Sequence, residues 1–200
     1  MASTMPHEAR LSARRGEARE QAIAEATLGL LAEIGYEAVT MDAVAARARA
    51  SKATIYRRWQ GKAELVAYAL RKCSPADHVD VPKTGSLRGD LIALLSRLRD
   101  KFDTNDKALL SGVLHAMQRD SELATIMRTQ LIDNRRVVLG QIEQRAKEYG
   151  IDPVGMKQVG DVMPGSMMMR LLITGDPVDE TFIAGLIDDV ILPLLQRKFD

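Results

Sequence analysis

Two short helices separated by a tight turn are predicted between residues 40 and 62, and this pair constrains the fold more than any other segment. Met41 and Val44 recur at helical spacing after Thr40, whose hydroxyl can accept a hydrogen bond from a free amide of the first helical turn. Ser51 is placed to cap the second helix in the same way. This outline is that of a helix-turn-helix.

The second helix is predicted to expose a face that suits DNA. Ile55 and Trp59 are four residues apart and share an inward face, whereas Arg57 points roughly the opposite way. A guanidinium can donate two hydrogen bonds to guanine, small side chains allow close approach to the major groove, and phenol and ammonium groups reach phosphates. The exposed face with its flanks consists of Lys52, Ala53, Thr54, Tyr56 and Arg57. The sequence therefore predicts a double-stranded DNA partner.

The segments on either side of this motif extend the pattern. Upstream, a helical spacing leads to Gly35 and Tyr36, and downstream Trp59 and Lys62 frame the entry to the next helix. The upstream helical positions are Ile23, Thr27, Leu30, Leu31 and Ile34. Together these segments resemble the DNA-binding domain of the TetR family of bacterial transcriptional regulators. The resemblance implies an all-α fold, in which an N-terminal three-helix helix-turn-helix domain precedes a C-terminal helical bundle for effector binding and dimerisation.

One position departs from that family. Its turn usually carries glycine two residues before the capping serine, and this chain has Arg49 there. If the turn needs a positive φ, arginine costs on the order of 1 kcal/mol where glycine costs almost nothing. The turn is then slightly strained or differently shaped, and Arg49 becomes a candidate for a phosphate contact. The residues predicted to bind DNA are Thr40, Arg49, Ser51, Lys52, Ala53, Thr54, Tyr56, Arg57 and Lys62.

The charge of the chain is divided along its length. The net charge is +1, but residues 1–72 hold twelve lysines and arginines against eight acidic residues, and the remainder holds sixteen against nineteen. The part with the helix-turn-helix is therefore basic, as expected for a DNA-binding head. No apolar run approaches the roughly 20 residues that span a bilayer, and the N-terminus lacks the apolar core of a signal peptide. We expect a cytoplasmic protein with no membrane partner.

The sequence divides into three predicted parts. Residues 1–15 are expected to form a flexible arm, residues 16–73 the helix-turn-helix DNA-binding domain, and residues 74–200 the effector-binding and dimerisation domain. Two prolines and the loss of helical period mark a linker between residues 74 and 85. Beyond it, helices are predicted over residues 87–102, 108–119, 121–149, 153–174 and 179–197.

The helix predicted over residues 153–174 combines a proline with several methionines. Pro164 removes one backbone donor and clashes with the preceding turn, so it should kink or divide the helix near Val162. The methionines at 163 and at 167–169 either line a pocket for varied apolar ligands or fill a helix interface. Pro164, Arg170, Leu171, Leu172, Gly175 and Pro177 are similar to the C-terminal domain of one regulator subgroup of the same family.

The family resemblance also implies an effector pocket, bounded by the helices between Leu87 and Tyr149. The chain has only three Phe, four Tyr and one Trp for stacking, so an apolar effector is predicted. Its polar anchors are expected to be His115 and Arg135. The residues predicted to bind the effector are Leu94, Leu98, Leu114, His115, Met117, Met127, Met163 and Met167.

The last predicted helix carries a wide apolar arc, which favours a homodimer. Ile183, Ile187 and Val190 lie in one stripe, while Leu186 and Ile191 spread the arc beyond what one partner can cover. The residues predicted to form the dimer interface are Met168, Leu171, Ile183, Ile187, Val190 and Leu194.

No motif for catalysis is found in the sequence. It has no Gly-rich phosphate loop, no paired His or Cys residues at metal-ligand spacing and no supported Ser, His and Asp set, so no enzymatic activity, cofactor or metal is predicted. The combined prediction is a DNA-binding regulator, a repressor that a small molecule releases from a palindromic operator. The alternatives are an activator, an effector-independent DNA binder or, from a different class, a helical small-molecule binding protein with a vestigial helix-turn-helix.

Overall fold

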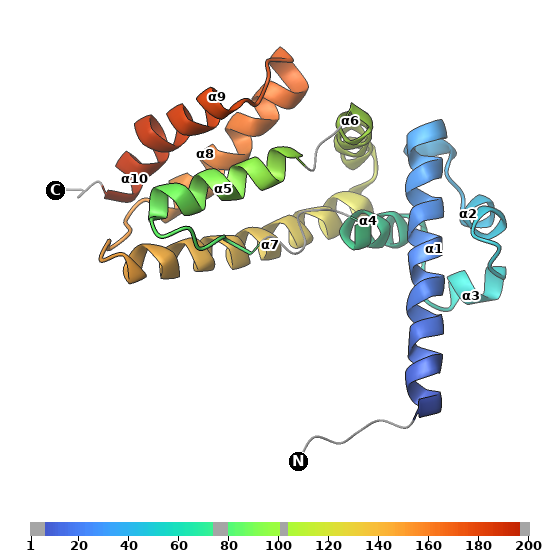
Figure 1. Ribbon diagram of the computed structural model, residues 1–200. Coiled ribbons are helices and arrows are strands. Elements are labelled where there is room, and N and C mark those ends of the chain that lie inside the picture. The colour runs from blue at the N-terminus through green and yellow to red at the C-terminus, as the bar shows by residue number, and fades with distance from the viewer. Residues whose placement is uncertain (1–6, 74–79, 101–103, 197–200) are drawn as a thin grey trace. The chain divides into compact units, whose positions relative to one another are not determined.

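The computed structural model of the chain describes residues 7–73, 80–100 and 104–196 (Figure 1). Side chains are described for residues 16–72, 80–100 and 108–196. Every regular element in these ranges is a helix, which confirms the predicted all-α fold. The α-helices are α1 (His7–Ala38), α2 (Met41–Arg47), α3 (Lys52–Tyr56), α4 (Lys62–Cys73), α5 (Leu87–Asp100), α6 (Thr104–Arg119), α7 (Ser121–Glu148), α8 (Met156–Met168), α9 (Glu180–Gly185) and α10 (Leu192–Gln196). Two π-helical segments, η2 (Met169–Thr174) and η3 (Leu186–Ile191), continue α8 and α9.

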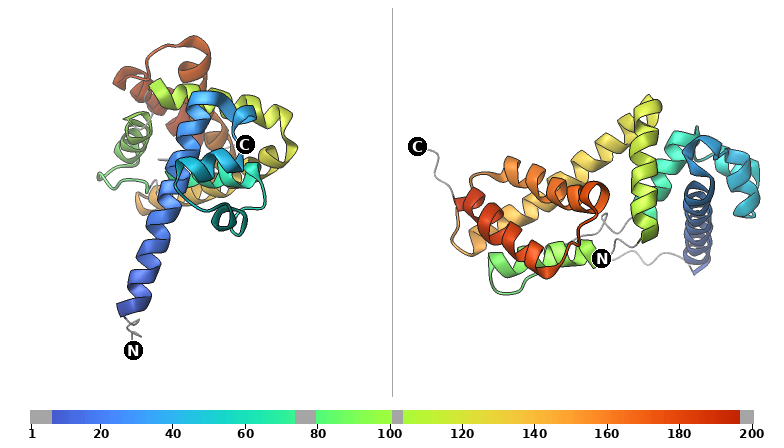
Figure 2. Two further views of the ribbon diagram at one scale, coloured as in Figure 1. Left: turned by 90° about the vertical axis from the view of Figure 1, so that its right-hand side faces the viewer. Right: turned by 90° about the horizontal axis from the view of Figure 1, so that it is seen from above.

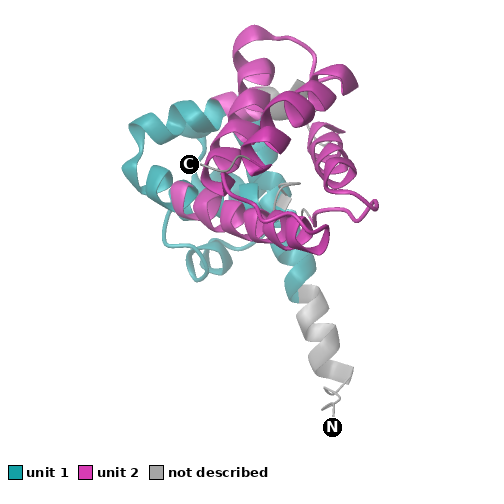
Figure 3. Ribbon diagram, turned by 90° about the vertical axis from the view of Figure 1, so that its left-hand side faces the viewer, with its two compact units in different colours: residues 1–74, 112–127 teal, residues 75–111, 128–200 magenta. Residues whose placement is uncertain are grey.

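The chain forms two compact units, and the first of them is discontinuous in sequence (Figure 3). It consists of Met1–Ser74 and Gly112–Met127, whereas the second consists of Pro75–Ser111 and Arg128–Asp200. The sequence placed the boundary between the DNA-binding domain and the effector-binding and dimerisation domain between residues 73 and 74. The structure instead assigns the end of α6 and the start of α7 to the same unit as the helix-turn-helix.

The first unit is built around the long helix α1. The view along α1 in Figure 2 shows α4 and α2 packed on different sides of it, and α3 in turn packs on α2. Gly35 has a φ of 73°, which ends the regular part of α1 at the predicted glycine-aromatic exit. Of the predicted flexible arm over residues 1–15, residues 1–6 lie outside the described residues, and residues 7–15 lie in α1, which begins at His7. This stretch is rich in Ala, Glu and Arg, which have high helix propensity.

The second unit holds a large apolar core. Helix α5 packs against α9 and η3, while α8 packs against η3 and α10. The innermost side chains, all 0 or 1% exposed, are Leu91, Leu94, Leu95, Ile142, Val159, Ile183, Ile187, Ile191 and Leu195. These residues come from helices that are far apart in the sequence, so the core ties the last two helices to α5 and α7.

The start of α8 differs from its predicted position. The helix begins at Met156, and not at the Asp152–Pro153 pair, because the chain first runs beside α10. The backbone N–H of Val154 donates to the carbonyl of Leu195 at 3.1 Å. Gly155 has a φ of 32°, and a Cβ added there would lie 2.3 Å from the Leu194 carbonyl oxygen. Only glycine permits this close approach.

Pro164 does not divide its helix as the sequence suggested. Helix α8 runs through it without a break near Val162, and the change to π-helical bonding begins five residues later, at Met169. Pro164 is exposed, whereas Met163 and Met167 beside it are buried in the core of the second unit. Tertiary packing of the buried face therefore outweighs the local cost of the proline.

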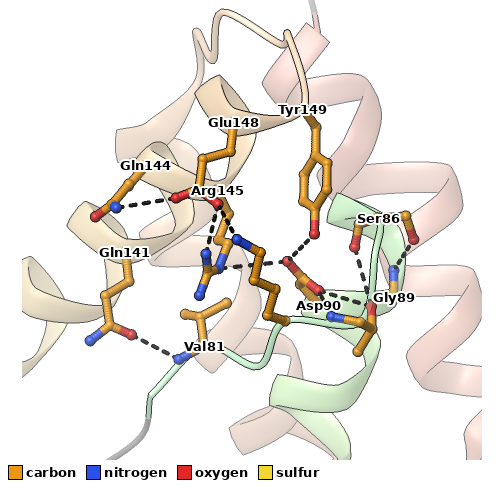
Figure 4. A network of polar contacts seen from close by, with 11 residues as sticks. Val81, Ser86, Gly89, Asp90, Gln141, Gln144, Arg145, Glu148 and Tyr149 are labelled. Atoms are coloured by element: carbon orange, nitrogen blue, oxygen red, sulfur yellow. Dashed lines mark hydrogen bonds and ion pairs between the residues drawn. The ribbon is translucent and has the colours of Figure 1, made fainter.

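A buried carboxylate fastens the segment before α5 to the end of α7 (Figure 4). Asp90 is fully buried, and its Oδ1 accepts hydrogen bonds from the backbone N–H of Thr84 at 2.6 Å and from the Thr84 hydroxyl at 2.8 Å. Its Oδ2 accepts from the Tyr149 hydroxyl at 3.2 Å, and the Arg145 guanidinium lies 3.9 Å away. The buried carboxylate is thus satisfied by partners from two segments, the one before α5 and the end of α7.

Candidate nucleic-acid interface

The predicted caps of the helix-turn-helix are present. The backbone N–H of Ala43 donates to the Thr40 hydroxyl at 3.1 Å at the start of α2. The backbone N–H of Thr54 donates to the Ser51 hydroxyl at 3.2 Å at the start of α3. Each cap satisfies an amide that the first helical turn leaves free, so both short helices begin where the sequence predicts.

The turn between α2 and α3 places Arg49 in the left-handed region. Its φ is 50°, and among the described residues it is the only one other than glycine with a positive φ. The N–H of Ala50 donates to the Ala45 carbonyl at 3.0 Å, and the N–H of Arg49 donates to the Ala46 carbonyl at 3.2 Å. These two bonds form a Schellman motif, in which the position of Arg49 usually belongs to glycine. The predicted strain in this turn is therefore confirmed.

We expect Arg49→Gly to stabilise the protein by about 0.5 to 1 kcal/mol, because relief of the strained φ exceeds the entropy that glycine adds to the unfolded chain. Urea unfolding of the variant measures this difference. Ala48→Gly is the matched control, since Ala48 has a φ of −77° and gains nothing from glycine; it should destabilise by a similar amount. A less stable Arg49→Gly variant would mean that the arginine side chain contributes more than its backbone costs.

Helix α3 exposes the face predicted for DNA. Ile55 and Trp59 are 0% and 4% exposed, as expected for the inward pair. On the opposite side Lys52, Ala53, Tyr56 and Arg57 are exposed, and Thr54 is half-buried. The predicted division of this helix into a buried stripe and a polar face is confirmed.

Lys52 has an acidic partner within this face. Its ammonium lies 2.6 Å from the Asp42 carboxylate of α2, and this hydrogen bond raises the pKa of Lys52. Both side chains are more than half exposed, so the pair is weak and open to exchange with a phosphate. The ion pair crosses from α2 to α3.

Lys62, predicted to contact a phosphate, is held by the end of α1. Its ammonium donates to the carbonyl oxygens of Tyr36 at 3.0 Å and Glu37 at 3.4 Å, and it lies 4.2 Å from the centre of the Tyr36 ring. Two of its three N–H bonds are therefore used within the protein. The sequence did not indicate these contacts, which hold the Lys62 side chain against the end of α1.

Tyr36 also joins the head to the corner between α6 and α7, within the first unit. Its hydroxyl donates to the Asp120 carboxylate at 2.5 Å, and this hydrogen bond lowers the pKa of Asp120. Burial, together with the nearby Asp120 charge, raises the pKa of Tyr36 well above its usual range. Asp120 also accepts from the backbone N–H of Leu123 at 3.0 Å, which caps α7. The two residues are 84 positions apart, so no local pattern could have predicted their contact.

Two family models match the chain. Residues 23–69 match the model described as bacterial regulatory proteins, tetR family, and residues 81–190 match a tetracyclin repressor-like C-terminal domain. The chain belongs to the TetR family. Within the described part of this TetR-family chain, no helix has the length and apolar character needed to cross a membrane.

Named relatives agree with the TetR-family assignment. The chain is 38% identical to the DNA-binding transcriptional repressor TetR of Mycobacteroides abscessus, over 91% of this chain and 96% of the relative. It is 31% identical to the uncharacterized HTH-type transcriptional regulator YdeS of Bacillus subtilis, over 86% and 88% of the two chains. The crystal structure of the TetR family transcription regulator SCO0332 is similar with a TM-score of 0.64 and 30% identity, covering 84% of this chain and 94% of that one. These relatives have a non-enzymatic role, and this TetR-family protein is a DNA-binding transcriptional regulator.

The residues predicted to bind an effector divide evenly between the two units of the TetR-family chain. The first unit holds Leu114, His115, Met117 and Met127, and the second holds Leu94, Leu98, Met163 and Met167. Leu94, Met163 and Met167 are buried in the core of the second unit, with Leu98 packed against it. In the first unit His115 is exposed, and its three apolar companions are half-buried.

Arg135, expected as a polar anchor for the effector, is engaged within the second unit. Its guanidinium lies 2.7 Å from the Asp161 carboxylate and donates to the Lys157 carbonyl at 2.9 Å. A Cβ added to Gly160 would lie 2.5 Å from the Arg135 Nε, so the missing side chain of Gly160 makes room for this contact. Arg135 therefore joins α7 to α8 in the TetR-family chain.

The residues predicted to form the dimer interface differ in exposure within the second unit of this TetR-family chain. Ile183 and Ile187 are fully buried within their own unit and cannot reach a second copy. Val190 is 37% exposed, while Met169 and Ile173, which the prediction omitted, are 51% and 72% exposed. The remaining predicted positions, Met168, Leu171 and Leu194, are half-buried. Ile183, Ile187, Ile191 and Leu195 recur every four residues and are all 0% exposed, so the side of the last helix that holds Ile183 and Ile187 faces the core of its own unit.

Proposed function

We propose that this TetR-family protein is a transcriptional repressor that binds a two-fold symmetric operator as a homodimer and leaves it when a small apolar effector binds. The observation that carries the proposal is the exposed apolar surface of the last two helices. Met169, Ile173 and Val190 are large apolar residues that the chain leaves in contact with solvent. Surface of this kind marks an interaction site when several such residues gather.

A second copy of the chain is the occupant that best fits this surface. A shallow groove on the last helix is lined by Asp189, Val190, Pro193, Leu194 and Gln196. A two-fold dimer presents the same patch from both partners, so ridges and grooves of one copy meet those of the other. The symmetry also sets two helix-turn-helix heads at the spacing of two half-sites, one helical turn of DNA or a multiple of it apart.

Repression and effector release complete the proposal. The 38% identical relative is named a repressor, which supports this sign of regulation over activation. Leu94, Met163 and Met167 pack in the core of the free chain, so an effector has to displace flexible side chains as it enters. It lowers DNA affinity if it binds better to a conformation with wrongly spaced heads, typically through about 1 to 3 kcal/mol of coupling.

Selection of bound fragments from random DNA tests the DNA part of the proposal. We expect a palindromic consensus, and sedimentation of the complex should give two chains per site. A consensus without two-fold symmetry, or one chain per site, would contradict the dimeric mode. Transcription in vitro from a promoter that contains the site should fall as protein is added, whereas a rise would make the protein an activator. Apolar compounds that raise the Tm should also release the DNA.

A further inference from the structure

A groove in the first unit is lined largely by arginine side chains. It lies between the N-terminal half of α1 and the end of α3, and its volume is about 360 Å³. Its lining residues are Gly16, Arg19, Glu20, Ile23, Thr54, Arg57 and Arg58. Three guanidinium groups thus meet one carboxylate around a single groove.

The one carboxylate is already occupied. Glu20 forms an ion pair with Arg58 and accepts a hydrogen bond from the Tyr68 hydroxyl at 2.7 Å. Neither Arg19 nor Arg57 has a hydrogen bond or an ion pair with any residue that the structure describes, and both are exposed. The groove therefore carries two uncompensated positive charges in the free protein.

Two free guanidiniums facing one groove suit an anion with several oxygens. The planar fork of each arginine can donate two parallel hydrogen bonds to a phosphate, which a lysine cannot do. The Glu20 carboxylate pairs with Arg58 and accepts a hydrogen bond from Tyr68 of α4. These contacts position Arg58 and Glu20 on their side of the groove in the absence of an anion.

The position of the groove identifies the source of the phosphate. Thr54 and Arg57 belong both to the groove and to the end of α3, whose exposed face bears Lys52, Ala53 and Tyr56. A duplex that lies against this face brings a strand of its backbone to the mouth of the groove. We propose that the groove binds a backbone phosphate of the operator and that Arg19 and Arg57 clamp it from two sides.

This assignment changes the expected role of Arg57. The sequence alone favoured a base contact, whereas in the clamp Arg57 positions the protein on DNA and carries no sequence information. It also extends the DNA-contacting surface from the helix-turn-helix to Arg19 of α1. The inference rests on DNA binding by α3, and it is independent of the repressor, dimer and effector parts of the proposed function.

Titrations of the full chain on the selected duplex and on a scrambled duplex, at several salt concentrations, test the clamp. We expect Arg19→Ala and Arg57→Ala each to weaken binding about tenfold on both duplexes. The slope of log affinity against log salt should fall by about one in each variant, and by no more in the double variant, because both residues hold the same phosphate. Arg97→Ala, which removes an exposed arginine from α5 in the second unit, is the matched control and should bind like wild type.

Duplexes with one neutral methylphosphonate locate the phosphate. At one position per half-site, the substitution should weaken wild type about tenfold and leave the double variant unchanged. Two results of the titrations would overturn the clamp. One is an Arg19→Ala variant that binds both duplexes as tightly as wild type does. The other is an Arg57→Ala variant that binds only the selected duplex more weakly, which would restore the base-reading role of Arg57.

A rise in Tm with inorganic phosphate, together with unchanged DNA binding in both variants, would assign the groove to a free anion. A wild type that binds no duplex at low salt would instead overturn DNA binding itself.

Discussion

Asp90→Ala is expected to lower the free energy of unfolding by about 3 kcal/mol or more, because it removes a fully buried carboxylate and leaves the groups that donate hydrogen bonds to it without that acceptor. The backbone N–H of Thr84 and the Tyr149 hydroxyl lose their acceptor, and the Thr84 hydroxyl loses its shorter hydrogen bond (Figure 4). Arg145 loses an ion-pair partner at 3.9 Å but keeps Glu148. Urea unfolding monitored by circular dichroism measures the change. Because these partners fix the segment before α5 and the end of α7, the second unit should loosen first.

A matched control separates the effect on stability of removing a buried carboxylate from that of removing an exposed one. Asp100 lies on the same helix and pairs with Arg99, but its side chain is 63% exposed. Asp100→Ala should therefore change stability by no more than about 0.5 kcal/mol. Asp90→Asn keeps the shape and one acceptor oxygen, so its loss should fall between those of the two alanine variants. A loss below about 1 kcal/mol for Asp90→Ala would mean that water replaces the carboxylate in this network.

Ile173→Asp is expected to weaken dimerisation about 100-fold or more, because a carboxylate placed in an apolar contact costs several kcal/mol. Ile173 is 72% exposed in the single chain, so the substitution leaves the core of the second unit intact. Sedimentation equilibrium gives the dimer affinity, and thermal unfolding of the variant checks that the fold is kept. Affinity for a two-fold operator should fall with dimerisation, whereas affinity for a single half-site should not change.

Ile132→Asp provides the comparison. Ile132 is 65% exposed and has the same side chain, but it belongs to α7 and not to the last two helices, so this variant should remain dimeric. Dimerisation unchanged in Ile173→Asp but lost in Ile132→Asp would place the interface on α7. Ile187→Asp, which the sequence pattern would have favoured, is a poor test, because Ile187 is fully buried and its replacement would unfold the second unit.

The features that follow from neighbouring residues could be predicted from the sequence. The caps at Thr40 and Ser51, the buried pair Ile55 and Trp59, and the strained turn at Arg49 all depend on a few adjacent positions. Helical period and capping preferences act over the same short range. This is why the helix-turn-helix was the most reliable part of the prediction.

The features that were missed depend on tertiary contacts. The wide apolar arc of the last helix did not show which of its sides faces the core, and Ile187 is fully buried whereas Ile173 is 72% exposed. The bond from Tyr36 to Asp120 joins distant segments, and so does the use of Thr84 and Tyr149 by Asp90. A single sequence contains no signal for such pairs, because neither partner alters the pattern around the other.

The discontinuous first unit has a consequence for the order in which the protein is made. The ribosome releases the helix-turn-helix early, but its Tyr36 hydroxyl finds Asp120 only after 84 more residues have been added. Since domains fold as units during synthesis, a nascent chain that ends before Met127 carries an incomplete head. A product that ends before Asp120 therefore lacks the hydrogen bond to Tyr36 that joins the end of α1 to the corner between α6 and α7.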